Sequence, residues 1–235
     1  MADLSNIKLF ATHPHECSYL DDVKATTIFV DPQQTVTTKL YSRLSELGFR
    51  RSGSHVYRPQ CQVCKACKPT RIVAADFQLK RAHKRCLKRN SDVDVRVSKV
   101  FNMELYYPLY ERYITERHRD GDMFPPNEEQ FVSFLNSEWD MTEYLEFWLE
   151  DQLIGVAVSD RLDNGLGAVY TFYDPNMERR SIGTFAILWQ IQYAVDENLN
   201  FLYLGYWIKQ SKKMNYKIQF RPLQMLIEQQ WLTIL

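Results

Sequence analysis

The sequence Gly165-Leu-Gly-Ala-Val-Tyr-Thr-Phe-Tyr-Asp174, continued by Pro175-Asn-Met-Glu-Arg-Arg-Ser-Ile-Gly-Thr184, decides the fold class of this chain. The first part predicts a strand, and the second predicts a turn that carries Arg179 and Arg180 just before a helix start. Backbone N–H groups and the helix dipole at such a start favour an anion. The pattern indicates a phosphate-bearing ligand, and the alternative is a surface turn whose arginines are only solvated.

The elements around this turn suggest one arrangement. Hydrophobic periodicity predicts a helix over 181–197 and a strand over 201–207 after the turn. Before it, the pattern predicts a helix over 103–117, a helix that starts at Asn127, and strands over 144–149, 153–159 and 168–173. This order is that of the GCN5-related acetyltransferase-like fold, in which the turn holds the pyrophosphate of a ligand on the next helix. We therefore expect an α+β fold for the C-terminal half, by fold-level analogy.

The N-terminal half carries its own mixed pattern of elements. We expect strands over 26–30, 49–58, 70–74 and 93–97, a helix over 35–47 that Gly48 ends, and a short basic helix over 80–90. The sequence is therefore divided into a basic, cysteine-containing α/β domain over 1–99 and an acyltransferase-like domain over 100–235. The order of elements in the N-terminal domain resembles a partial copy of the C-terminal domain.

Charge is separated along the chain although the formal net charge is zero. Residues 50–99 hold 14 Lys and Arg against 3 Asp and Glu, whereas residues 102–163 hold 4 against 15. Such separation indicates a face for a polyanion such as RNA, with an acidic segment elsewhere. The alternative is that the two segments pack together and neutralise each other.

Neither a membrane span nor a signal peptide is expected. The chain has no run of about 18 apolar residues, and its first six residues lack the charged and apolar regions of a signal peptide. We therefore expect a cytoplasmic protein without a membrane partner. Five cysteines without an export signal also argue against a disulfide framework.

Three of the cysteines form the sharpest local motif. Cys61, Cys64 and Cys67 follow one another at three-residue spacing, so that a turn can aim their sulfurs inward. Cys17, with His13 or His15 beside it, could complete four ligands for zinc or an iron–sulfur cluster. The alternative is a set of reduced cysteines that only shapes the loop, because the second cysteine pair of a zinc ribbon is absent.

Two further segments have the composition of nucleic-acid binders. The basic helix holds six cations that can contact phosphates or grip a carboxylate: Lys80, Arg81, Lys84, Arg85, Lys88 and Arg89. The block 203–217 interleaves aromatic residues with lysines, as single-stranded nucleic acid binding requires. For Tyr206 and Trp207, packing of a strand on a core is the alternative.

Together these motifs resemble one family over nearly the whole chain. The motifs, in order, are Cys17-Ser-Tyr-Leu, the cysteine cluster, Leu87-Lys-Arg-Asn, Val169-Tyr-Thr-Phe-Tyr-Asp-Pro175, Arg180-Ser-Ile-Gly-Thr184, Tyr203-Leu-Gly-Tyr-Trp-Ile208 and Lys213-Met-Asn-Tyr-Lys217. The chain is similar to the arginyl-tRNA–protein transferases, and most of all to their bacterial branch, the aspartate/glutamate leucyltransferases. The resemblance implies an aminoacyltransferase that moves leucine from leucyl-tRNA to proteins beginning with Asp or Glu and marks them for N-end rule degradation, without acetyl-CoA.

The resemblance also suggests roles for individual residues. For the 3′ end of the aminoacyl-tRNA we expect Arg179, Arg180, Ser181, Gly183 and Thr184, and for nearby phosphate or the acceptor peptide Lys209, Lys212, Lys213 and Lys217. For the acidic residue of the acceptor, which needs a cation with fixed donors, we expect Arg71, Lys80, Arg85 and Lys88. No general base stands out; Tyr170, Tyr173 and Asp174 are weak candidates, more readily structural than catalytic.

Three other readings of the sequence stay open. The chain could be an RNA-binding protein without enzymatic activity, in which the cysteines fold a basic knuckle. It could be an acetyl-CoA-dependent acetyltransferase, although its ligand turn lacks the fuller glycine-rich pattern expected there. It could also transfer arginine instead of leucine, since no residue identified here reads the transferred side chain. No cofactor is required by the expected reaction.

Overall fold

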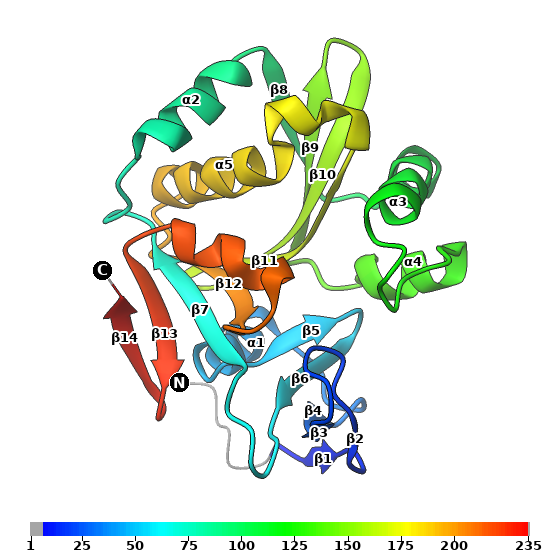
Figure 1. The fold of residues 1–235 in the computed structure, drawn as a ribbon, viewed down its shortest axis with the longest axis vertical. Helices are drawn as coiled ribbons and strands as arrows, with labels where there is room; N and C mark the ends of the chain where they lie inside the picture. The colour runs from blue at the N-terminus through cyan, green and yellow to red at the C-terminus, as the bar shows by residue number, and fades with distance from the viewer. Residues whose placement is uncertain (1–6, 235) are drawn as a thin grey trace.

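An eight-stranded mixed sheet organises the computed structural model, which describes residues 7–234 (Figure 1). Its strand order is β14-β13-β7-β12-β11-β10-β9-β8. In chain order the strands are β7 (Lys68–Val73), β8 (Val93–Ser98), β9 (Thr142–Leu149), β10 (Gln152–Arg161), β11 (Gly165–Tyr173), β12 (Phe201–Trp207), β13 (Leu223–Ile227) and β14 (Gln230–Ile234). β11 and β12 run parallel, and the other neighbouring pairs are antiparallel.

Helices cover both faces of this sheet (Figure 1). α5 (Ile182–Asp196) and α2 (Arg81–Arg89) lie on one face, and α3 (Met103–Arg117) and α4 (Glu128–Leu135) lie on the other. The pleat explains this, because alternate residues of a strand point to opposite faces. On β9, Leu145 and Phe147 pack in the core beneath α5, whereas Tyr144 packs with α3 and α4.

Local sequence signals set the helix ends. Asn102 and Asn127 cap α3 and α4, because their side-chain oxygens accept hydrogen bonds from the N–H groups of Leu105 and Gln130 at 3.0 and 2.8 Å. Gly48 follows α1 (Thr38–Glu46) with φ +84°, the left-handed conformation that ends a helix. The predicted helix starts and stops are confirmed at these points.

A smaller sheet forms the other end of the molecule. It contains β1 (Leu9–Ala11), β4 (Thr27–Val30), β6 (His55–Pro59) and β5 (Arg50–Ser52) in that order, and β2 (His15–Glu16) pairs separately with β3 (Lys24–Ala25). α1 packs against this sheet through Leu40 and Leu44, which contact the core around Ile28 and Val56. The same core includes Tyr203 of β12, so the two sheets share buried side chains.

A buried ion pair fixes the small sheet to the large one. The guanidinium of Arg51 on β5 donates to both carboxylate oxygens of Asp160 on β10, at 2.6 and 2.8 Å, and both side chains are fully buried. The hydroxyl of Thr142 also donates to Asp160, at 2.9 Å. β7 and β8 come before residue 99 in the sequence, yet both lie in the large sheet. The predicted domain boundary at residue 99 therefore separates β8 from β9, which are neighbouring strands of one sheet.

Most predicted elements are present, and three stretches differ. Residues 9–25 contain the short strands β1, β2 and β3, where no element was predicted. The stretch 49–58 is a hairpin, not a single strand, because Gly53 turns the chain at φ +57° and packs so tightly that a Cβ there would lie 2.0 Å from the Ser133 carbonyl oxygen. After β12 the chain forms a 3-10 helix, η2 (Lys212–Gln219), and the hairpin β13–β14, neither of which was predicted. Within residues 7–234, no helix is both long enough and apolar enough to cross a membrane.

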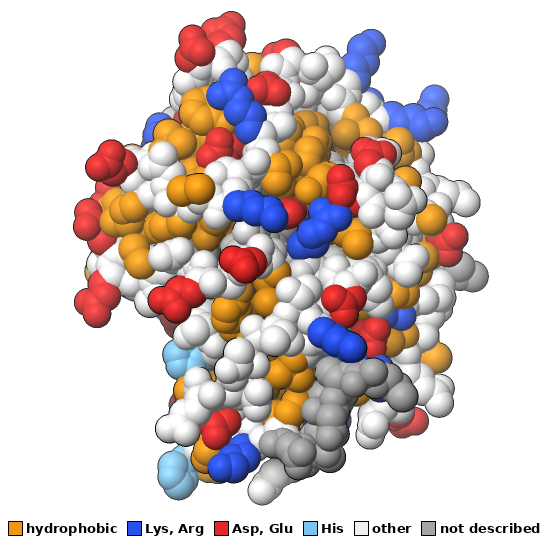
Figure 2. Space-filling view, turned by 180° about the vertical axis from the view of Figure 1, so that it is seen from behind, with side chains coloured by type: hydrophobic (Ala, Val, Ile, Leu, Met, Phe, Trp, Pro, Cys, Tyr) orange, Lys and Arg blue, Asp and Glu red, His pale blue; other side chains and the backbone are white. Residues whose placement is uncertain are grey.

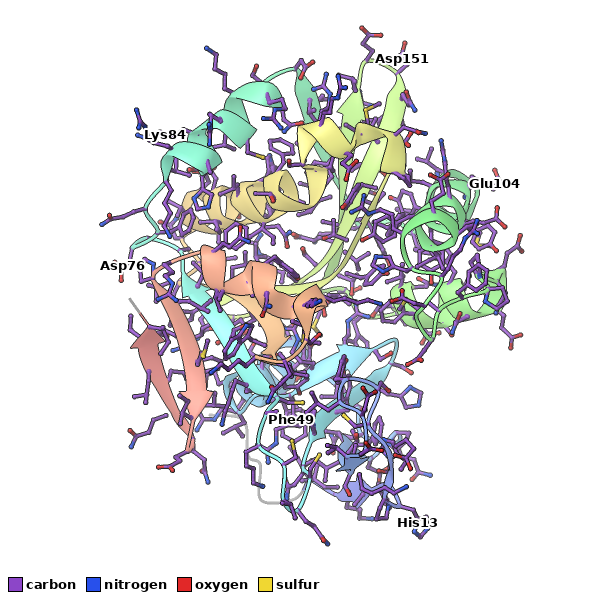
Figure 3. The ribbon with its side chains drawn as sticks, viewed as in Figure 1. His13, Phe49, Asp76, Lys84, Glu104 and Asp151 are labelled. Atoms are coloured by element: carbon purple, nitrogen blue, oxygen red, sulfur yellow. The ribbon has the colours of Figure 1, made fainter. Side chains whose placement is uncertain are left out.

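The charged segments lie on different sides of the molecule. Figure 2 shows acidic side chains along the edge formed by α3 and α4, and basic side chains at the corner formed by α2. In Figure 3, Lys84 of α2 and Glu104 of α3 extend into solvent on opposite sides. The basic segment 50–99 and the acidic segment 102–163 therefore do not pack together along their full length and cancel each other's charge. The cations of α2 remain exposed.

Candidate functional site

The arginine-bearing turn is tied to the end of α2. It forms a 3-10 helix, η1 (Pro175–Arg180), and Ser181 then adopts the left-handed conformation, φ 56° and ψ 48°, before α5 begins. The guanidinium of Arg180 donates to both oxygens of Asp92 at 2.7 and 2.9 Å and to the Arg89 carbonyl at 3.0 Å. This guanidinium, through its hydrogen bonds, lowers the pKa of the Asp92 carboxyl. Arg180 therefore holds the turn in place, whereas Arg179 is exposed.

The first turn of α5 lies against an aromatic ring. A Cβ at Gly183 would lie 3.2 Å from the ring of Tyr173, so glycine allows that ring to rest on the helix start, beside Thr184. The centroid of the Tyr173 ring lies 5.0 Å from the centroid of the Tyr113 ring. The same centroid lies 5.6 Å from the guanidinium carbon of Arg117. Tyr173 thus connects α3, β11 and the predicted ligand turn.

The other two catalytic candidates have structural partners. Asp174 is 2% exposed, and its carboxylate accepts from the Asn176 N–H at 2.9 Å, which caps η1. It also accepts from Arg112 and Gln152, both at 3.4 Å. Tyr170 packs among aromatic rings of α3 and α4, and burial raises the pKa of its hydroxyl well above the ordinary value. These contacts agree with the structural alternative for both residues.

Pairing between β11 and β12 stops soon after it begins. The register joins Gly165–Gly167 of β11 with Phe201–Tyr203 of β12 and extends no further within the described residues. The side chain of Arg50, from β5, lies where pairing stops. Its guanidinium donates to the Tyr203 carbonyl at 3.4 Å and to the Ala168 carbonyl, so it bridges the two strands.

Two features make room for Arg50. Gly205 has φ +80° and lies at a bulge in the pairing of β12 with β7, and a Cβ there would lie 3.5 Å from the Arg50 Nε. Opposite, a Cβ at Gly167 would lie 3.9 Å from an Arg50 terminal nitrogen. Glycine in a strand often marks such a close approach. Gly205, a glycine inside a predicted strand, was therefore the one feature of the sequence that could have indicated this close approach of another side chain. The residues around Arg50 gave no such indication.

Lys217 lies near Arg50, because its ammonium binds the carbonyl of Tyr206, the residue that follows Gly205, and Arg50 packs against Gly205. This lysine of η2 is 7% exposed, and its ammonium donates to the Tyr206 carbonyl and lies 5.7 Å from the centre of the Tyr216 ring. Burial, and secondarily the charge of Arg50, lowers the pKa of Lys217 to about 7. The remaining predicted lysines of this segment differ, since Lys209, Lys212 and Lys213 are all exposed. Lys213 forms an ion pair with Asp120 at 2.8 Å.

The four cations predicted for the acceptor do not meet at one place. Arg85 and Lys88 are exposed on α2, and Lys80, the residue just before α2, is exposed and donates to the Gln219 carbonyl at 3.4 Å. Arg71 is buried in the large sheet on β7. Its guanidinium lies 3.6 Å from the Phe201 ring centre and 4.2 Å from that of Trp231, and donates to the Gln224 side chain at 2.7 Å. Arg71 is thus already enclosed by partners within the sheet.

The predicted cysteine cluster does come together. Cys17, Cys61, Cys64 and Cys67 line one pocket at the end of the small sheet, with Arg58, Lys65 and Tyr206 among its other walls. Burial, and after it the neighbouring cysteines, raises the pKa of Cys67 to about 12. All five cysteines are free thiols. As the side chains lie, no group of three or more His, Cys, Asp or Glu residues within 7–234 is arranged to hold a metal ion.

Solved structures give a weak match. The C-terminal domain of a putative lysylphosphatidylglycerol synthetase from Agrobacterium fabrum is 11% identical and covers 76% of this chain and 54% of that one, with a TM-score of 0.48. A structure of L-PGS from Bacillus licheniformis is 8% identical and covers 86% of this chain and 69% of that one, with a TM-score of 0.47. Similarity at this level supports no conclusion about function.

Protein sequences give a strong match over the full length. A protein of Pseudomonas fluorescens named aspartate/glutamate leucyltransferase is 54% identical over 234 residues, which is 100% of both chains. A protein of Teredinibacter turnerae with the same name is 54% identical over 235 residues, covering 100% of this chain and 97% of that one. Models of the N and C termini of arginine-tRNA-protein transferase match residues 15–85 and 105–227. The chain belongs to the arginine-tRNA-protein transferase family.

Proposed function

We propose that this chain is an aspartate/glutamate leucyltransferase: it moves leucine from leucyl-tRNA to the α-amino group of proteins that begin with Asp or Glu. The observation that carries this proposal is the match of 54% identity over the full length of relatives bearing that name. The product would be marked for N-end rule degradation, and the reaction would take place in the cytoplasm.

We further propose that the C-terminal half works as a GCN5-related acetyltransferase-like domain. The elements from α3 to β12 follow the order of that fold, and β11 and β12 are a parallel pair whose pairing stops after Gly167 and Tyr203, while the start of α5 lies farther along β11, where Gly183 packs on Tyr173. In this proposal the aminoacyl ester lies where the two strands part, and the terminal adenosine lies near Gly183 and Thr184. The helix dipole at the start of α5 supports an anionic ligand there.

The chemistry demands little of the protein because an aminoacyl ester is already activated. The neutral α-amino nitrogen attacks the ester carbonyl carbon, a C–N bond forms, and the bond to the tRNA ribose oxygen breaks. The nitrogen loses one proton, and the departing ribose oxygen gains one. A free α-amino group has a pKa near ~7.7–8, so an appreciable fraction is neutral without a strong base. Positioning of the two reactants therefore supplies most of the rate enhancement.

The exposed cations suit the tRNA. α2 presents Lys84, Arg85 and Lys88 to solvent, while its Cys86 packs in the core that it shares with α5. Arg179 lies next to it, because Arg89 of α2 donates to the Arg179 carbonyl. Exposed, solvated cations contact the phosphates of a nucleic acid well, and this contact is independent of the base sequence. We therefore assign α2, together with Arg179, Lys209 and Lys212, to the tRNA.

One experiment separates this function from its rivals. The purified protein is incubated with radiolabelled Leu-tRNA or Arg-tRNA and with peptides that begin with Asp, Glu, Arg or Ala. We expect label on the Asp and Glu peptides from Leu-tRNA alone. Label that comes from Arg-tRNA would show that the protein transfers arginine instead of leucine. Binding of tRNA without any labelled peptide would favour an RNA-binding protein, and acetylation of peptides with acetyl-CoA would favour an acetyltransferase.

A further inference from the structure

Arg50 and Lys217 are two buried cations without an acidic partner. Arg50 is 8% exposed and Lys217 is 7% exposed. The ion pairs of residues 7–234 include neither side chain. The neighbouring Arg51, by contrast, is buried against Asp160, as buried charges usually are. Two uncompensated buried charges near each other are costly, so their presence at one place needs a reason.

The hydrogen bonds of the two side chains leave capacity for a ligand. Arg50 donates to the Tyr203 and Ala168 carbonyls, and Lys217 donates to the Tyr206 carbonyl. A guanidinium has five N–H donors and an ammonium has three, and carbonyl groups contribute no formal negative charge. An anion that accepts the remaining donors would supply both the hydrogen bonds and the compensating charge.

The position of the pair restricts what that anion can be. It lies where β11 and β12 cease to pair, which in the proposed function is where the ester meets the acceptor amine. In an N-terminal Asp or Glu, the side-chain carboxylate is only two or three carbon atoms from the α-amino carbon. A cation that binds this carboxylate must therefore lie next to the reacting amine, and exposed cations on α2 or the enclosed Arg71 do not meet this requirement.

We propose that Arg50 and Lys217 form the carboxylate site that selects Asp or Glu at the acceptor N-terminus. This inference rests on the proposed function. Arg50 comes from the N-terminal half of the chain and Lys217 from the C-terminal half, so the site exists only when the two halves are joined. The fixed guanidinium supplies direction for the hydrogen bonds, and the ammonium supplies a second charge.

The test compares acidic acceptors with their neutral isosteres. Rates of leucine transfer are measured with saturating Leu-tRNA and peptides that begin with Asp or Asn, and with Glu or Gln, which differ in charge but hardly in shape. For Lys217→Met, we expect the ratio of kcat/KM for Asp over Asn to fall by about 10- to 150-fold, the loss typical of a hydrogen bond to a charged group. Lys217→Arg keeps the charge and should retain most of the preference. A ratio is unaffected by loss of folded protein.

The matched control is Lys39→Met, which removes an exposed lysine from α1. This variant should keep the wild-type ratio. An unchanged Asp-to-Asn ratio in Lys217→Met would overturn the inference. A raised KM for Leu-tRNA at an unchanged ratio would also overturn it, and would assign the pair to a tRNA phosphate instead.

A binding measurement separates this inference from the proposed function. Fluorescence anisotropy of labelled peptides beginning with Asp or Asn is followed without tRNA. If the wild type transfers no leucine yet binds the Asp peptide more tightly, and Lys217→Met abolishes that difference, the proposed function fails and the carboxylate site stands. If neither protein distinguishes the peptides by binding or by transfer, the carboxylate site is refuted.

Discussion

Replacing Lys217 by methionine should stabilise the folded protein at pH 7 while it impairs acceptor selection. The ammonium of Lys217 is buried near Arg50, and the pKa of the lysine falls from an ordinary 10.5 to about 7 in the folded chain. A folded-state pKa below the unfolded value means that the unfolded chain binds more protons between these two pH values. Stability is therefore lowest below pH 7 and rises as the pH increases toward 10.5.

The magnitude follows from that shift. Each pKa unit corresponds to about 1.4 kcal/mol, so the buried lysine costs about 4 kcal/mol at pH 7 and about 2 kcal/mol at pH 9. Methionine fills a similar volume without a charge, but it leaves the Tyr206 carbonyl without this donor, which costs about 1–3 kcal/mol. The net gain should be about 1–3 kcal/mol at pH 7 and close to zero at pH 9.

Urea unfolding, followed by circular dichroism at pH 7 and at pH 9, measures both values. The difference between variant and wild type cancels the other titrating groups, so it reports Lys217 alone. It should shrink by about 2 kcal/mol between the two pH values. A variant less stable than the wild type at pH 7, or a difference that does not depend on pH, would refute the reasoning that Lys217 is a buried, destabilised cation kept for its function.

The remaining predictions concern the turn, the tRNA surface and the cysteines. Arg180→Ala should abolish leucine transfer and leave the far-ultraviolet circular dichroism unchanged; wild-type transfer would remove the turn from the site, and Asp92→Ala reports how much of the loss is the broken ion pair. The double variant Lys84→Gln with Lys88→Gln should weaken tRNA binding and lower the slope of log K against log salt by about two; an unchanged slope would exclude α2 from the contact. Transfer should need no metal, because the ester is already activated: protein prepared without oxygen should hold less than about a tenth of an equivalent of zinc or iron by elemental analysis. A full equivalent whose removal abolishes transfer would contradict this and assign the metal to Cys17, Cys61, Cys64 and Cys67.

The sequence by itself determined the local elements and the family. The cap at Asn127, the stop at Gly48 and the strand β8 with its alternating Val93, Val95 and Val97 are set by residues only a few positions apart, which is why they could be predicted. The order of motifs was equally visible, since it depends only on the chain. The three-residue spacing of Cys61, Cys64 and Cys67 also indicated that these three cysteines lie close together. They line one pocket, together with the fourth cysteine, Cys17.

Only the tertiary structure decided which cations are free and which are already engaged. Arg179 and Arg180 are neighbours in sequence, yet one is exposed and the other is paired with Asp92, 88 positions away. Arg50 bridges Ala168 and Tyr203, 118 and 153 positions away, and lies near Lys217, which the sequence grouped with three exposed lysines. Composition and spacing report that a residue carries a charge. Burial and long-range partners decide whether that charge holds the fold together or awaits a ligand, and these are properties of the folded chain alone.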